Sequence, residues 1–150
     1  MKVVEKGGIL VTLIVLAVLA VTAAPEGTLQ GWTPVYVVGL QYVAAARDAR
    51  IQGVVRVRCS LNSDGSVRLA TIVSGHPIWT NAVLENAREW RFARSGPSVS
   101  SDQSALLTYE FKLTDPVCTG QYREQFAFDE PNHIIVTSQF PCWQPDRAEH

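Results

Sequence analysis

The stretch that decides the fold is VVRVRCSLNSDGSVRLATIVS, residues 54–74. Apolar residues occupy every second position of its first part: Val55, Val57, Cys59 and Leu61. That period of two is typical of a strand with one buried face. The letters NSDG that follow are all turn formers and end in a glycine, before a second β-rich run. The stretch therefore predicts an antiparallel hairpin with strands at about 54–61 and 66–74.

Two helices are expected on either side of this hairpin. Residues 40–50 combine helix-forming alanines with apolar residues three or four positions apart, and Gly53 is expected to end that helix. Between Pro77 and Phe92 a second helix is expected, with Thr80 as a candidate cap. Its apolar face consists of Trp79, Val83, Ala87 and Trp90. We expect this face to lie in the core.

More β-structure is expected in the second half of the chain. Residues 105–113 follow a polar loop and place alternate apolar side chains on one face. Farther on, residues 122–128 and 133–140 are β-rich and are separated by the turn-forming letters DEPN. The sequence therefore predicts a third strand and then a second hairpin.

Three cysteines allow three single-bridge pairings. Cys118 and Cys142 bracket the second hairpin, which would bring them close together, as a disulfide requires. Cys59 lies on the expected buried face of a strand, where cysteine usually acts as a small hydrophobe. We therefore expect a Cys118–Cys142 disulfide, formed in an oxidising compartment.

The first residues have the pattern of an export signal. Lys2 and Lys6 precede an apolar run, and small residues before Pro25 make cleavage after Ala23 plausible. An uncleaved anchor in the inner membrane, facing the periplasm, is the alternative. Against it, the run from Ile9 to Ala24 is shorter than the roughly 20 residues that a membrane-spanning helix needs. We expect a periplasmic or secreted protein, with membrane contact only through this segment if it stays uncut.

The composition excludes several functions. A net charge of −1, with acidic residues interspersed among the arginines, gives no basic patch for nucleic acid. The cysteines and histidines lack the close spacing of a zinc site, so no metal is expected. His76, next to Pro77, is expected to serve local hydrogen bonding. We expect no catalytic residues, no cofactor and no enzymatic activity.

Four ordered pieces of the chain resemble the C-terminal domain of TonB. They are YVAAARDARIQG at 42–53, the Asp64-Gly65 turn, VSGHP at 73–77 and ENAREWRF at 85–92. The resemblance implies an α+β fold in which two helices pack on a three-stranded antiparallel sheet at 40–113. The expected organisation is a signal or anchor (1–23), an irregular lead-in (24–39), this domain, and a disulfide-closed hairpin extension (114–150).

The resemblance also implies a binding mode. In that family the edge of the last strand receives an extended peptide, whose backbone satisfies the unpaired groups of the edge. Carried over to this chain, the edge consists of Ala105, Leu106, Leu107, Thr108, Tyr109, Glu110 and Phe111. The implied partner is a polypeptide, with an outer-membrane transporter segment as the candidate. Trp32 and Trp143, in segments expected to be irregular, are further candidates for a partner contact or for covering the core.

Three functions follow from these features. The first is a periplasmic adaptor that binds a polypeptide by strand addition at residues 105–111. The second is a structural envelope domain in which the C-terminal hairpin covers that edge. The third is an energy transducer of the TonB type. Two features argue against this third function: the N-terminal segment lacks an intramembrane Ser and His pair, and no Pro-rich spacer follows it. A free edge at 105–113 would separate the first function from the second.

Overall fold

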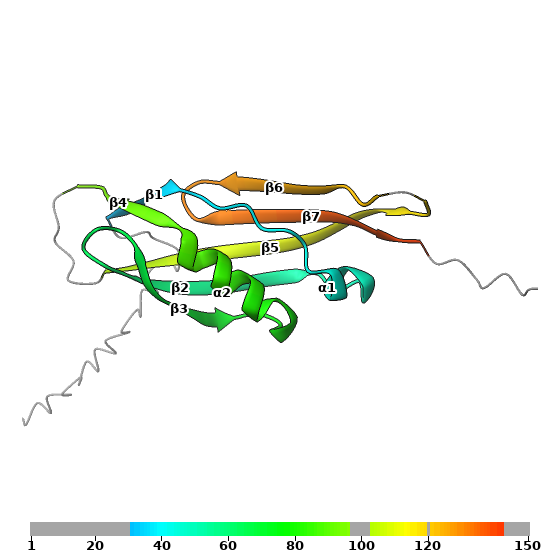
Figure 1. Cartoon of the computed structure of the whole chain (residues 1–150), viewed down its shortest axis with the longest axis horizontal. Coiled ribbons are helices and arrows are strands. Elements are labelled where there is room, and N and C mark those ends of the chain that lie inside the picture. The colour runs from blue at the N-terminus through cyan, green and yellow to red at the C-terminus, as the bar shows by residue number, and fades with distance from the viewer. Residues whose placement is uncertain (1–30, 97–102, 120, 143–150) are drawn as a thin grey trace, which may run out of the picture.

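The computed structural model describes residues 31–96, 103–119 and 121–142, which form an α+β fold (Figure 1). Its elements in chain order are β1 (Trp32–Tyr36), α1 (Ala44–Asp48), β2 (Gly53–Leu61), β3 (Val67–Ser74), the 3₁₀ helix η1 (Pro77–Trp79), α2 (Thr80–Glu89), β4 (Arg91–Arg94), β5 (Ser104–Val117), β6 (Glu124–Asp129) and β7 (His133–Pro141). Within the described ranges no helix is long and apolar enough to cross a membrane. The expected export segment at 1–23 and Trp143 lie outside those ranges.

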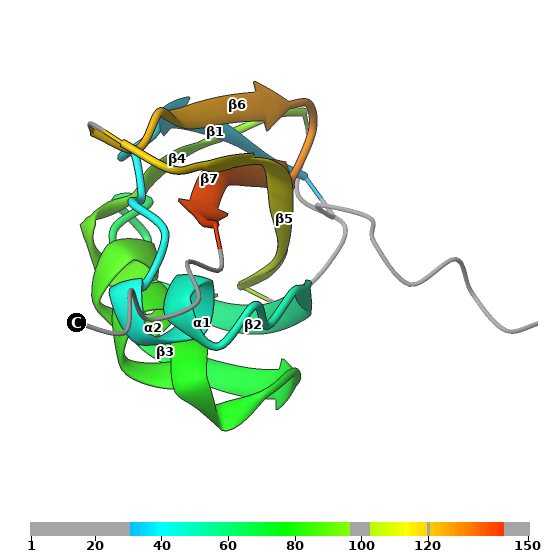
Figure 2. The ribbon, with the colours of Figure 1, turned by 90° about the vertical axis from the view of Figure 1, so that its right-hand side faces the viewer.

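The main sheet has five strands in the order β3-β2-β5-β7-β6, and β1 pairs with β4 in a separate two-stranded sheet. All neighbours are antiparallel except β5 and β7, which run parallel. The three expected strands and the expected second hairpin all form. The expectation of a three-stranded sheet with an added hairpin was wrong, because β7 joins the sheet beside β5. Figure 2 shows the sheet curling, with β6 above and β3 below.

The turn between β2 and β3 follows from its sequence. The carboxylate of Asp64 accepts hydrogen bonds from the Ser66 backbone nitrogen (2.9 Å) and hydroxyl (2.6 Å), which lower the pKa of Asp64. Gly65 has φ +82°, and a Cβ there would collide with the carbonyl group of Phe92. The Gly65 carbonyl accepts from the Phe92 nitrogen at 2.9 Å. Glycine is therefore required both by the backbone conformation and by the close approach of the chain.

The first helix is shorter than expected. It begins only at Ala44, because Val43 has extended dihedral angles. It ends through Arg50, whose φ is +56°, while Gly53 starts β2. The residue with left-handed dihedral angles is thus Arg50 and not the expected glycine. The hydrogen bond from the Ile51 nitrogen to the carbonyl oxygen of Ala46, at 2.8 Å, closes the helix end around it.

The second helix has the expected apolar face but a different start. Trp79, Val83, Ala87 and Trp90 are all fully buried. Thr80 does not cap the helix, because a 3₁₀ turn precedes it. Instead, Nδ1 of His76 accepts from the Ile78 nitrogen at 3.2 Å, so this histidine has the local role expected of it.

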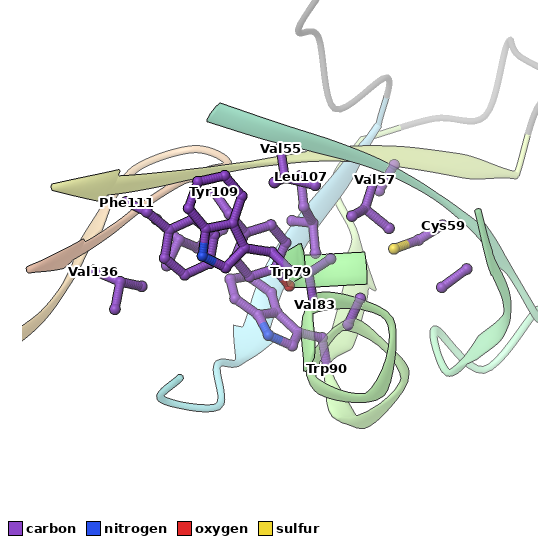
Figure 3. Packing of buried hydrophobic residues seen from close by; sticks show 14 of the residues in the cluster. Val55, Val57, Cys59, Trp79, Val83, Trp90, Leu107, Tyr109, Phe111 and Val136 are labelled. Atoms are coloured by element: carbon purple, nitrogen blue, oxygen red, sulfur yellow. The ribbon is translucent and has the colours of Figure 1, made fainter. Parts of the chain in front are cut away.

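The core lies between α2 and the inner face of the sheet. The rings of Trp79 and Phe111 stack with centroids 4.6 Å apart and nearly parallel planes. Figure 3 shows these rings beside Tyr109 and Trp90, with Cys59 farther along β2. Burial raises the pKa of the Cys59 thiol to about 12, so this cysteine stays protonated in the core.

The position of Trp32 in the fold differs from the one that the sequence predicted. It belongs to β1 rather than to an irregular segment, and only 4% of its surface is exposed. The guanidinium of Arg94 on the paired strand β4 lies 5.0 Å from its ring centroid. Trp32 therefore covers the core and offers little surface to a partner.

Candidate functional site: the filled edge of β5

The backbone N–H and C=O groups of β5 point alternately toward its two neighbouring strands, β2 and β7. The Leu61 nitrogen donates to the Gln103 carbonyl oxygen at 2.7 Å. This bond shows which residue pairs of the antiparallel β2–β5 ladder are hydrogen-bonded pairs. By the alternation of such a ladder, the N–H and C=O groups of residues 105, 107, 109 and 111 point toward β2. Those of residues 106, 108 and 110 point the other way. These three residues carry the edge that a partner strand would use.

That edge is filled by the chain itself. The Thr108 nitrogen donates to the Asn132 carbonyl oxygen at 2.9 Å, and Nδ2 of Asn132 donates to the Leu106 carbonyl oxygen at 2.8 Å. From there β7 pairs with β5 in parallel, from Thr108 with His133 to Val117 with Pro141. The sequence left open whether residues 105–113 have a free edge, and in the structure β7 covers that edge. Strand β5 lies inside the sheet.

The side chains of the expected binding residues divide between two faces. Ala105, Leu107, Tyr109 and Phe111 are buried in the core. Leu106, Thr108 and Glu110 are partly exposed on the opposite face of the sheet. A strand seated beside β5 would place its alternate side chains against both groups, as β7 does with Ile134 and Val136 on the buried face.

Glu110 forms a charged contact across the β5–β7 ladder. Its carboxylate lies 3.0 Å from Nζ of Lys112 on its own strand and 3.1 Å from Nε2 of His133 on β7. These neighbours, Lys112 first, hold the pKa of Glu110 below its ordinary value. The ionised carboxylate therefore stabilises the pairing of the two strands.

Helix α1 and the turn that follows it contact the C-terminal hairpin through two arginines. The guanidinium of Arg47 lies 2.9 Å from the Glu124 carboxylate on β6 and 4.1 Å from the ring centroid of Tyr122. Arg50 lies 4.9 Å from the ring centroid of Phe140 on β7. Both arginines belong to the part of the chain that resembles TonB, and their contacts bind the added hairpin to it.

A disulfide closes the end of the same ladder. Cys118 and Cys142 are bonded, as expected, with Cα atoms 4.9 Å apart. The Cys142 nitrogen donates to the Val117 carbonyl oxygen at 3.1 Å, which continues the pairing up to the bridge. Cys59 is free and buried, also as expected. The bridge covalently ties the end of β7 to the end of β5.

Sequence reasoning missed the residues that fill the edge. Asn132 was read only as a turn former, although it supplies both a carbonyl oxygen and an amide to β5. Arg47 was considered only as one of the arginines that are interspersed with acidic residues. The alternation of Ile134, Val136 and Ser138 indicates a strand with one buried face, but it does not indicate which strand lies beside it.

No group of three or more potential metal-ligating side chains occurs among the residues that the structure describes. The fold is a small α+β domain in which β5 is an inner strand, paired with β2 on one side and β7 on the other. A family model described as Gram-negative bacterial TonB protein C-terminal matches residues 38–113, just over half of the chain. The chain belongs to this family, which consists of non-enzymatic protein-interaction domains. None of the curated proteins and none of the solved structures compared with the chain matches it.

Proposed function

We propose that this protein is a non-enzymatic structural domain of the periplasm whose strand-acceptor edge is filled by its own β7. In this proposal the oxidised protein takes no transporter segment at Ala105–Phe111. The observation that supports it most strongly is the parallel pairing of β5 with β7, which begins at Thr108 and His133. Together with Asn132, it satisfies the outward-facing groups of residues 108 and 110 and the carbonyl oxygen of Leu106.

The fixed position of β7 supports the same proposal. The disulfide, the Arg47–Glu124 ion pair and the contact of Arg50 with Phe140 all act on the hairpin that carries β7. A competing peptide would have to displace a strand held at an effective concentration on the order of millimolar or more. Such a peptide would also have to replace Ile134 and Val136, which are fully buried.

A second candidate function is strand addition by a polypeptide partner at Ala105–Phe111 after β7 has left. The specific observation that favours it is that β5 already accepts a strand at this edge. An outer-membrane transporter segment is the proposed partner, by analogy with the family. This function requires a state in which the disulfide is open and β7 is released.

One titration tests both candidates. The probe is a labelled peptide with the sequence of residues 132–141, added to the oxidised chain and to the Cys118→Ser/Cys142→Ser variant. The structural proposal predicts no binding to the oxidised chain. Equal binding to both proteins would contradict it. Binding to the variant alone, abolished by the further change Thr108→Pro, would support the second candidate, because proline removes the nitrogen donor at residue 108.

A further inference from the structure

The solvent-exposed side of β2 and β3 combines cationic and apolar side chains. The charged residues of both strands are all arginines, and each of them is exposed. Five large apolar side chains of the described residues are exposed, and three of them, between 44% and 52% exposed, belong to these same two strands. We call this surface the arginine face, and it consists of Val54, Arg56, Arg58, Arg68, Leu69 and Val73.

The arginine face offers side chains to a partner rather than backbone groups. Arg58 lies opposite Thr71 of β3. Arg68 and Val73 are the residues at which β3 departs from regular pairing with β2. The regular part of β3 is therefore only Leu69–Ile72, and so short an edge is a poor template for an added strand.

The two borders of the sheet differ in charge. Strands β2 and β3 contain no acidic residue, and Asp64 in the turn between them accepts two hydrogen bonds from Ser66. Glu110, opposite Val54 on β5, already contacts Lys112. Strands β5 and β6 contain more acidic than basic residues. An anionic partner is thus attracted to the β3 border and repelled from the β6 border, at opposite sides of the ribbon (Figures 1 and 2).

A partner for this face has to match arginines and apolar side chains together, without a backbone template. A bilayer with anionic phospholipids does so. Its phosphates attract the guanidinium groups, and each arginine near such a surface strengthens binding about fivefold. Apolar side chains enter the boundary beneath the head groups. A purely acidic polypeptide would match the charges alone.

The place where the N-terminal segment joins the fold also favours a bilayer. The Gly31 carbonyl oxygen, at the start of the described residues, accepts from the Ser95 nitrogen at 2.8 Å. Ser95 directly follows β4, which is joined to the β2–β3 turn by the bond from the Phe92 nitrogen to the Gly65 carbonyl oxygen. The apolar run that ends at Ala24 is seven residues from Gly31, at most about 25 Å of chain. An uncut run would therefore hold the β2–β3 end of the domain at the bilayer surface.

We propose that the arginine face docks on the surface of a phospholipid bilayer that contains anionic lipids. Arg58 and Arg68 bind lipid phosphates, while Leu69 and Val73 enter the boundary between head groups and acyl chains. The β3 border faces the bilayer and the β6 border points away from it. This contact adds to the one expected of the N-terminal segment and forms also after that segment is cleaved. It is weak and sensitive to salt.

A fluorescent label whose emission shifts to the blue in apolar surroundings tests which part of the full chain meets the bilayer. The label is attached to Thr71→Cys on β3 and, in a matched chain, to Gln125→Cys, which is also exposed but lies on β6. The unsubstituted chain controls for labelling elsewhere, because Cys59 is buried and the other cysteines are bonded. With vesicles of equal amounts of phosphatidylcholine and phosphatidylglycerol, only the label at residue 71 is expected to shift. Equal shifts at both positions, or none at residue 71, would overturn the proposal.

The lipid concentration that half-shifts the label at Thr71→Cys measures the contribution of the charges. Arg58→Gln/Arg68→Gln is expected to raise it at least about tenfold. Arg88→Gln/Arg123→Gln, which removes two exposed arginines outside the face, is expected to change it less than about threefold. Near-ultraviolet circular dichroism verifies that both variants keep the core. Equal effects of the two pairs would overturn the proposal.

Lipid composition and a soluble polyanion separate the bilayer from other anionic partners. Vesicles of phosphatidylcholine alone are expected to leave the label at residue 71 unshifted, and added salt is expected to reverse the shift on the anionic vesicles. An equal shift on phosphatidylcholine alone would exclude the arginines as its cause and overturn the proposal. Poly-glutamate, without vesicles and at the same charge concentration, is expected to leave the anisotropy of the label unchanged. A rise as large as the vesicles cause would assign the face to an acidic polypeptide and overturn the proposal as well.

Discussion

The hydroxyl of Tyr109 donates a hydrogen bond to Oδ1 of Asn86, 2.9 Å away, and this contact joins β5 to α2. The same oxygen accepts from Nε1 of Trp90 at 3.1 Å. Nδ2 of Asn86 donates to the carbonyl oxygens of Val38 and Gly39 at 3.0 and 3.1 Å. One buried amide thus connects the helix, the central strand and the segment that follows β1.

Replacing Asn86 by alanine is expected to cost about 3–5 kcal/mol of unfolding free energy, because it leaves several buried polar groups without partners. Chemical denaturation measures this cost. Asn81→Ala, on the exposed side of the same helix, is the matched control and is expected to change stability by less than about 0.5 kcal/mol. Similar midpoints for the two variants would show that the Asn86 network contributes little.

Gly65→Ala is expected to destabilise far more than Gly96→Ala. Both glycines have positive φ, +82° and +91°, so both substitutions cost roughly 1–3 kcal/mol in backbone strain. Only at Gly65 would the new Cβ collide with backbone, at Phe92, whereas nothing lies within 4 Å at Gly96. Thermal unfolding of the pair isolates the collision, and equal losses would mean that strain alone is involved.

Opening the disulfide is expected to weaken the whole domain. The bridged residues are 24 positions apart, and a loop of that size contributes about 3 kcal/mol through the entropy of the unfolded chain. Denaturation of Cys118→Ser/Cys142→Ser against the oxidised chain measures this difference. Peptide mapping without reductant is expected to find Cys59 unlinked, and a bridge to Cys59 would contradict the assignment.

The contact of Glu110 with Lys112 and His133 predicts an acid-sensitive part of stability. Because the pKa of Glu110 is lowered on folding, its contribution is complete above the ordinary value of 4.5 and is lost as pH falls through the folded value. Glu110→Gln should therefore destabilise at pH 7, and the difference from the unsubstituted chain should shrink by about pH 3. Urea midpoints at both pH values test this, with exposed Glu89→Gln as the control. A difference that does not change with pH would exclude the ionic contact as its cause.

The sequence predicted the parts of the fold that local patterns determine. Two patterns predicted which side chains are buried: the period of two at Val55, Val57 and Cys59, and the helical spacing that begins at Trp79. The structure buries the side chains that both patterns indicate. The same patterns say nothing about neighbours. The period of two in β7 fits an appended hairpin as well as an inner strand, and only the tertiary contacts of Asn132 and Arg47 decide between them.

The central claim is that β7 fills the edge of β5, and amide hydrogen exchange along β5 in the oxidised chain tests it most directly. The amides of Leu107, Tyr109 and Phe111 bond toward β2, whereas those of Thr108 and Glu110 bond toward β7. The account predicts slow exchange at all five positions. Slow exchange at the odd-numbered positions with fast exchange at Thr108 and Glu110 would show an open edge and would contradict it.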